Sequence, residues 1–108
     1  RMEGKADSEP LAFLAYLEAL LRDRQKADPE KSYTARLFAS GPKRIAKKLG
    51  EEAVELALEA ENGEPGRFTE EAADLIYHLS VLLISKGLGW EEVIRELEKR
   101  HKPSPDKG

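Results

Sequence analysis

The segment KKLGEEAVELALEA, residues 47–60, has the hydrophobic spacing of an α-helix with one apolar face. At about 3.6 residues per turn, one stripe of this helix is apolar, comprising Ile45, Leu49, Ala53, Leu56 and Ala60. An adjacent arc is acidic, comprising Glu51, Glu52, Glu55 and Glu59. Carboxylates four residues apart repel, and each such pair destabilises an isolated helix by roughly 0.2–0.5 kcal/mol. The repeated repulsion indicates that the acids serve a purpose other than helix stability.

The composition argues against several functional classes. The chain has 108 residues, 36% of them charged, and a formal net charge of only -3, so its overall charge favours neither nucleic acid nor a membrane surface. The absence of cysteine excludes disulfides and thiolate metal sites and is typical of a reducing compartment. The most apolar run, residues 75–84, is much shorter than the roughly 20 residues that span a bilayer. We expect a cytoplasmic protein with no nucleic-acid or membrane partner.

Turn residues and hydrophobic periodicity divide the chain into helices, and no segment has the alternating pattern of a β-strand. The expected helical segments are residues 10–26, a short turn at 33–39, residues 42–62 and residues 90–101. A further helix ends at Gly87 and begins either at Pro65 or after an N-terminal cap at Thr69. Ser8 is a candidate N-terminal cap for the first helix. The fold class is therefore all-α.

The domain organisation follows from these helices. We assign residues 10–101 to one all-α domain, between flexible termini at residues 1–9 and 102–108. Residues 75–84 are apolar around nearly the whole helix, which indicates burial on several sides. The other helices of a 12.1 kDa protomer cover only part of that surface. We therefore expect a four-to-five-helix bundle completed by homodimerisation.

The acidic arc has a counterpart on the following helix, where Glu70 and Glu71 precede Asp74 by one turn. Elsewhere the chain pairs its surface charges in the favourable order, as in Glu91 with Arg95 and Glu96 with Arg100. If the two acidic helices pack together, their carboxylates face one another and require a neutralising cation. All-oxygen ligands predict Mg²⁺, for which Mn²⁺ should substitute. A solvated acidic surface is the alternative interpretation.

The segment from residue 22 to residue 48 is basic, although the chain as a whole is acidic. Its cations are Arg22, Arg24, Lys26, Lys31, Arg36, Lys43, Arg44, Lys47 and Lys48. Arg44 and Lys48 share the arc of the acids and are placed to hold phosphate oxygens while the acids hold the metal. The turn KSYTAR, residues 31–36, adds hydroxyl groups beside this region. Gly50, within a helix, indicates close approach of a ligand or another backbone, or else a tolerated defect.

These residues resemble a known family. Glu51-Glu52-x-x-Glu55 followed by Glu71-x-x-Asp74 looks like the paired motif of the all-α nucleoside triphosphate pyrophosphatases, the MazG-like superfamily. The stretches DPEKSYTARLFASGPKRIAKKLGEEAVELALEA and EEAADLIYHLSVLL are similar to the phosphoribosyl-ATP pyrophosphatase family, over about residues 11–101. The resemblance implies a MazG-like fold and Mg²⁺-dependent hydrolysis of phosphoribosyl-ATP to phosphoribosyl-AMP and pyrophosphate, the second step of histidine biosynthesis.

The resemblance also implies roles for particular residues. The expected metal ligands or water-activating acids are Glu51, Glu52, Glu55, Glu71 and Asp74. The expected substrate-binding residues are Lys31, Ser32, Tyr33, Thr34, Arg36 and Lys48, with Arg44 added because of its position on the acidic arc. In some organisms the next pathway enzyme is fused ahead of this domain, and because the chain has no room for it, we expect the stand-alone form.

Two other functions would use the same features. A house-cleaning pyrophosphatase that acts on noncanonical nucleoside triphosphates would keep the acids and differ around the base and ribose. A non-catalytic helical dimer would need no metal. Tyr77 and His78 lie in an apolar helix, so we expect core or interface roles for them rather than chemistry.

Overall fold

The computed structural model describes residues 9–102, and this part of the chain contains five helices and no strand. The helices are α2 (Ala12–Gln25), α3 (Tyr33–Ala39), α4 (Pro42–Asn62), α5 (Pro65–Ser85) and α6 (Trp90–His101). The all-α prediction is confirmed. Helix α2 begins at Ala12 rather than Pro10, with Leu11 at its N-cap position and no side-chain cap. The expected cap Ser8, and all but one residue of each expected flexible terminus, lie outside the described residues.

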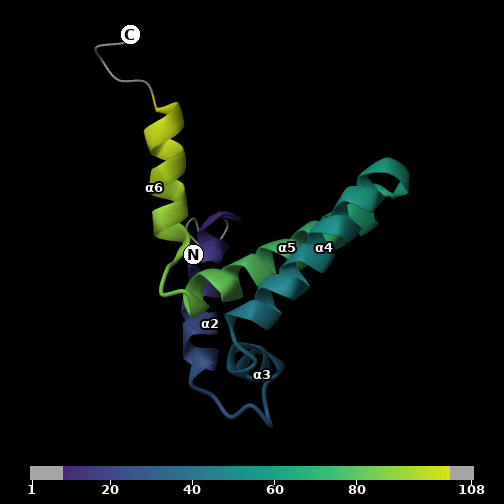
Figure 1. The fold of residues 1–108 in the computed structure, drawn as a ribbon. Helices are drawn as coiled ribbons and strands as arrows, with labels where there is room; N and C mark the ends of the chain where they lie inside the picture. Colours follow the sequence, from purple (N-terminus) through teal and green to yellow (C-terminus); the bar gives the residue numbers. More distant parts are fainter. Residues whose placement is uncertain (1–8, 103–108) are drawn as a thin grey trace, which may run out of the picture.

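The two longest helices, α4 and α5, form an antiparallel hairpin whose arms lie side by side (Figure 1). Helix α4 starts at Pro42 after Gly41, whose φ of 93° is in the region that favours glycine. The next helix starts at Pro65, which settles the choice left open by the sequence. Thr69 is not a cap, because its hydroxyl donates a hydrogen bond of 2.8 Å to the backbone carbonyl of Pro65 one turn earlier.

The hydrophobic core lies at the base of the hairpin, where α2 and α3 pack against it. The most buried apolar side chains of this core are Leu21, Leu37, Ile45, Val81 and Ile84. Ile45 near the start of α4 and Val81 near the end of α5 are both fully buried. The opposite end of the hairpin, with the α4–α5 turn, projects away from α2 and α3 (Figure 1). Packing therefore fixes α4 against α5 at the base, close to the segment that carries the basic residues.

Helix α6 is joined to the rest of the protomer through its first residue. The indole nitrogen of Trp90 donates to Ser80 Oγ at 2.8 Å, and the Trp90 backbone N–H donates to a Glu18 carboxylate oxygen at 2.9 Å. Arg22 donates to the carbonyl of Leu88 in the preceding turn at 3.2 Å. Beyond this anchor the helix stands apart from the hairpin (Figure 1) and has no buried residue. Its exposed ion pairs are those expected, Glu91 with Arg95 and Glu96 with Arg100.

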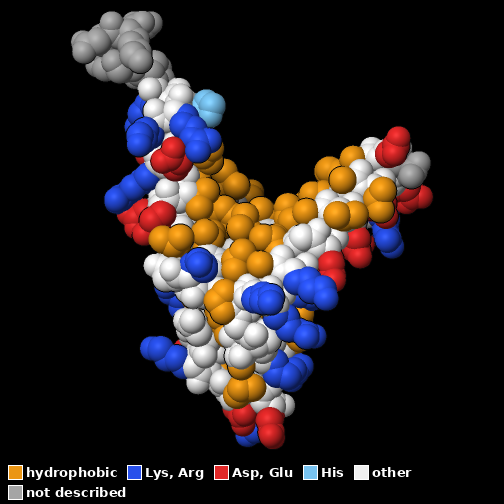
Figure 2. All heavy atoms as spheres, in the orientation of Figure 1, with side chains coloured by type: hydrophobic (Ala, Val, Ile, Leu, Met, Phe, Trp, Pro, Cys, Tyr) orange, Lys and Arg blue, Asp and Glu red, His pale blue; other side chains and the backbone are white. Residues whose placement is uncertain are grey.

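A second apolar face of α4 is exposed. Val54 and Leu58 are each 60% exposed and lie about half a helical turn away from the buried Ile45. Gly50 is on the same face as Val54, one turn earlier, and a Cβ atom there would meet no described atom within 4 Å. The described part of the protomer therefore makes no close approach to Gly50. Figure 2 shows hydrophobic side chains lining the hollow between α6 and the hairpin.

Helix α5 is less completely covered than its composition predicts. Of residues 75–84, only His78, Ser80, Val81 and Ile84 are buried, and the others are half-buried. Across residues 9–102, no helix combines the length and apolar character needed to cross a membrane.

Candidate metal and phosphate site

Three carboxylates from two helices meet halfway along the hairpin. Glu52 and Glu55 come from α4, and Glu71 comes from α5. Each offers one oxygen atom, and these three oxygens all lie within 4.8 Å of one another. Because Glu52 and Glu55 are three residues apart, they project from the same side of α4. The expectation that acids of the two helices face each other is confirmed for these three, which we call the carboxylate trio.

The carboxylate trio holds negative charge that the described side chains compensate only weakly. One oxygen of Glu52 and one of Glu71 are buried and have no hydrogen-bond partner within the described part of the chain. Loss of solvation raises the pKa of Glu71, and the nearby charges of Glu55, Asp74 and Glu52 raise it further. Oxygen atoms that are buried without a donor are costly unless a cation meets them. The trio therefore fits a hard divalent ion such as Mg²⁺, which accepts carboxylate oxygens and retains several waters.

The structure separates the other two predicted acids from the trio. Asp74 is exposed on α5, one turn after Glu71, and its charge acts on the Glu71 carboxyl group. Glu51 is exposed on α4 and is not a member of the trio. Both residues remain adjacent to the trio along their helices, so their roles as ligand or proton acceptor stay predictions.

Sequence reasoning missed Arg67, which lies beside the trio. Its guanidinium nitrogen is 3.3 Å from a Glu59 oxygen and 4.0 Å from a Glu71 oxygen. Glu59, which shares the acidic arc of α4, is thereby paired rather than left with the trio. The four-residue spacing of Arg67 and Glu71 is visible in the sequence. It brings the two side chains together only if both residues belong to one helix, which requires α5 to begin at Pro65. Arg67 is more than half exposed, so it neutralises the trio only in part.

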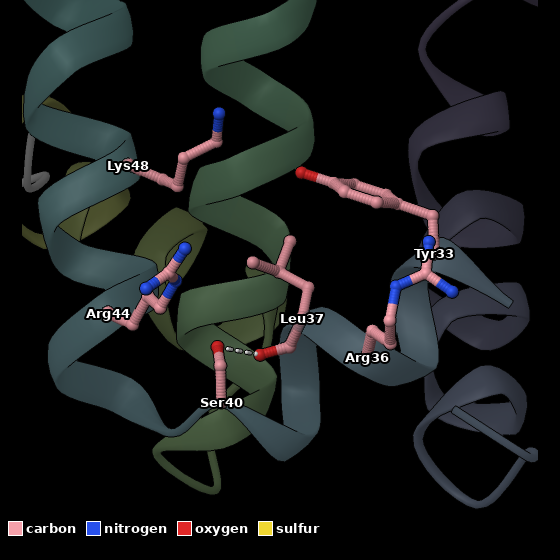
Figure 3. A pocket seen from close by; sticks show the side chains of 6 residues that line it. All are labelled: Tyr33, Arg36, Leu37, Ser40, Arg44 and Lys48. Atoms are coloured by element: carbon pink, nitrogen blue, oxygen red, sulfur yellow. Dashed lines mark hydrogen bonds between the residues drawn. The ribbon is translucent and has the colours of Figure 1, made fainter. Parts of the chain in front are cut away.

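A basic pocket of about 440 Å³ opens next to the N-terminal half of α4 (Figure 3). Its lining residues are Tyr33, Arg36, Leu37, Ser40, Arg44 and Lys48. The guanidinium of Arg36 lies 5.8 Å from the centroid of the Tyr33 ring and donates to the carbonyl of Pro29 at 3.0 Å. Arg44 and Lys48 extend from α4 on the opposite side of the pocket. The lining thus carries three cations and no acid, as an anion site requires.

Four of the predicted substrate-binding residues line this basic pocket, namely Tyr33, Arg36, Arg44 and Lys48. Three do not. Ser32 caps α3 by accepting a hydrogen bond of 3.1 Å from the backbone N–H of Ala35, and Lys31 is exposed. The Thr34 and Tyr77 hydroxyls form a hydrogen bond of 2.5 Å between α3 and α5. Within the described chain, Ser32 and Thr34 position α3, and sequence reasoning missed Leu37 and Ser40 as lining residues.

Tyr77 and His78 occupy core positions, as expected. Tyr77 packs on the core, and burial raises the pKa of its hydroxyl. His78 is 6% exposed, and its Nδ1–H donates to the backbone carbonyl of Asp74 at 2.9 Å. The carbonyl can only accept, so Nδ1 carries a proton. Within residues 9–102, Nε2 is buried without a hydrogen-bond partner.

Comparison with known proteins assigns the family. The family model for phosphoribosyl-ATP pyrophosphohydrolase matches residues 14–101. The histidine biosynthesis bifunctional protein HisIE of Escherichia coli is 57% identical over 89 residues, which are 82% of this chain and 44% of that protein. HisIE of Photobacterium profundum is 52% identical over 99 residues, 92% of this chain and 48% of that protein. The chain spans about half the length of the curated relatives it matches. The chain belongs to the phosphoribosyl-ATP pyrophosphohydrolase family, as the resemblance in its motifs predicted.

Proposed function

We propose that this protein hydrolyses the α,β-phosphoanhydride of phosphoribosyl-ATP, releasing pyrophosphate and phosphoribosyl-AMP in the second step of histidine biosynthesis in the cytoplasm. The observation that carries the proposal is the carboxylate trio, two of whose oxygens are buried without a donor from the described residues, next to a pocket with three cations. Family membership over residues 14–101 supports the choice of substrate.

The metal ligands in this proposal are Glu52, Glu55 and Glu71, whose oxygens already lie within 4.8 Å of one another. Mg²⁺ is the expected ion, and Mn²⁺ should substitute for it. When bound, the ion supplies neutralisation of phosphate charge and a more acidic water molecule. Asp74 and Glu51 lie beside the trio and are the candidates to accept the proton of the attacking water, because neither is needed to assemble the three ligands.

The basic residues orient the phosphates of the substrate. Lys48 precedes Glu52 by four residues, which is roughly 6 Å along the axis of α4. Its ammonium group lines the basic pocket and is the pocket cation nearest to the trio along the helix. A lysine at this position holds the β- or γ-phosphate and stabilises the negative charge that leaves with pyrophosphate.

We further propose a homodimer, formed through the exposed apolar face of α4. This face includes Val54 and Leu58, each 60% exposed, and Gly50, where an added Cβ atom would meet no described atom within 4 Å. Ile94 and Leu97 add exposed apolar side chains on α6. A hollow lined with hydrophobic side chains, as in Figure 2, is unusual on a monomer and typical of a surface that a second chain covers.

The test of the proposed activity is pyrophosphate release from phosphoribosyl-ATP, measured beside a panel of ordinary and modified nucleoside triphosphates. We expect a strong preference for phosphoribosyl-ATP that EDTA abolishes and Mg²⁺ restores. Glu55→Gln and Asp74→Asn should abolish turnover while leaving the helical circular dichroism intact, whereas Glu61→Gln, an exposed acid on the same helix, should retain activity. Preference for a triphosphate would indicate the house-cleaning function, and no release from any substrate would indicate a non-catalytic dimer.

A further inference from the structure

The basic pocket lies on the N-terminal side of the carboxylate trio along α4. Along α4, the midpoint of Arg44 and Lys48 precedes the midpoint of Glu52 and Glu55 by roughly 11 Å, at a rise of about 1.5 Å per residue. Neighbouring phosphates of a triphosphate share a single bridging oxygen. For a triphosphate whose α,β linkage lies at the trio, Lys48 is the nearest pocket cation along α4, and Arg44 lies one helical turn farther away.

The far end of the pocket is organised to bind an anion. Arg36 is held in place by the Pro29 carbonyl and by the face of the Tyr33 ring, so less side-chain freedom is lost when it binds. Among residues 9–102, no carboxylate forms a salt bridge with Arg36 or Arg44. In Figure 3 the two arginines come from different helices, α3 and α4, on opposite sides of one opening that both of them line.

The substrate assigned under the proposed function carries a second phosphate in a suitable place. In phosphoribosyl-ATP, a ribose 5-phosphate is attached to the adenine ring, so its phosphate is separated from the triphosphate by two sugars and the base. Ordinary nucleoside triphosphates lack this group. We propose that Arg36 and Arg44 bind the phosphate of this second ribose, and that this contact distinguishes phosphoribosyl-ATP from other nucleotides. The exposed ring of Tyr33 provides an apolar wall for the sugar.

This inference rests on the proposed function, and product inhibition tests it. Phosphoribosyl-AMP carries the second ribose phosphate but no β- or γ-phosphate, whereas pyrophosphate carries only those two. Arg44→Gln should raise the inhibition constant of phosphoribosyl-AMP by about tenfold or more, because a charged hydrogen bond is lost. The same variant should change the inhibition constant of pyrophosphate by less than about twofold. Arg36→Gln should act in the same direction.

Lys43→Gln is the matched control, because Lys43 is exposed on the same turn of α4 and does not line the pocket. It removes the same charge, so a general effect of electrostatic attraction would appear in both variants. If Arg44→Gln weakens inhibition by pyrophosphate instead, the pocket holds the leaving group and the inference is wrong. If neither inhibition constant changes, the inference is equally wrong, although hydrolysis of phosphoribosyl-ATP would leave the proposed function standing.

The two proposals can fail separately. If the wild-type protein does not hydrolyse phosphoribosyl-ATP, the proposed function fails, and calorimetric titration of the protein with phosphoribosyl-AMP then tests the pocket directly. Binding that Arg44→Gln weakens by about tenfold, and that Lys43→Gln leaves unchanged, would still support a site for the ribose phosphate. Absence of binding, or equal binding by both variants, would overturn it.

Discussion

Shortening Leu58 on the exposed face of α4 should weaken the proposed homodimer by about two orders of magnitude. Leu58→Ala removes Cγ and both Cδ atoms, and each CH₂-sized group contributes about 0.8 kcal/mol when it is fully buried. Leu58 is 60% exposed in the protomer, so dimer formation can bury at most that fraction, or about 1.4 kcal/mol per copy. In a two-fold symmetric dimer, Leu58 of each protomer is buried in the interface, so the substitution weakens dimer formation by about 3 kcal/mol in total. At about 1.4 kcal/mol per factor of ten, the dissociation constant should rise about 100-fold.

The assay is sedimentation velocity over a dilution series that crosses the wild-type dissociation constant. Leu21→Ala is the matched control, because it removes the same atoms from a side chain that is 2% exposed in the protomer core. It should lower the free energy of unfolding by about 2–5 kcal/mol and leave the dissociation constant of the folded dimer within about threefold. A wild-type protein that stays monomeric at every concentration would refute the reasoning, as would a Leu58→Ala dimer as tight as the wild type.

Three further outcomes are expected. In EDTA, Glu71→Gln should be more stable than the wild type at neutral pH. This difference in the free energy of unfolding should shrink as the pH falls through the raised folded-state pKa of Glu71 toward 4.5, because the wild-type carboxyl then becomes protonated. Urea denaturation at several pH values measures the difference, and a difference that does not change with pH would contradict the prediction. Ser80→Ala should leave the indole N–H of Trp90 without its acceptor and lower the free energy of unfolding by about 1–3 kcal/mol. Because Trp90 is the single tryptophan, its fluorescence spectrum should also shift. An unchanged spectrum and an unchanged urea midpoint would argue against this hydrogen bond as the anchor of α6. Gly41→Ala should lower the free energy of unfolding by about 1–3 kcal/mol, because the φ of 93° is strained for any residue with a side chain; an unchanged thermal midpoint would show that the turn relaxes.

Helix boundaries were predictable where the chain provides strong local signals. Pro42 and Gly63 bound α4, and the bounds predicted for this helix and for α6 agree with the structure. The start of α5 was ambiguous because Pro65 is suited to a first helical turn and Thr69 to an N-terminal cap. Only the structure shows that the Thr69 hydroxyl donates a hydrogen bond to the Pro65 carbonyl, within a helix that begins at Pro65. Local propensity determines where a helix can begin, whereas the hydrogen bonds that form determine where it does.

The sequence by itself determined the helical class, the family and the presence of acidic faces on two successive helices, because apolar spacing and charge repulsion are properties of single helices and do not depend on their packing. The rotation of α5 about its own axis against α4 is set by the packing of the core, to which Ile45 and Val81 both belong, and by the α4–α5 turn, and no pattern within one helix specifies it. Tertiary structure alone therefore decided that Glu71, and not Asp74, completes the trio, and that Arg67 lies beside it. For the same reason, the pocket formed between α3 and α4 became visible only after the two helices were packed.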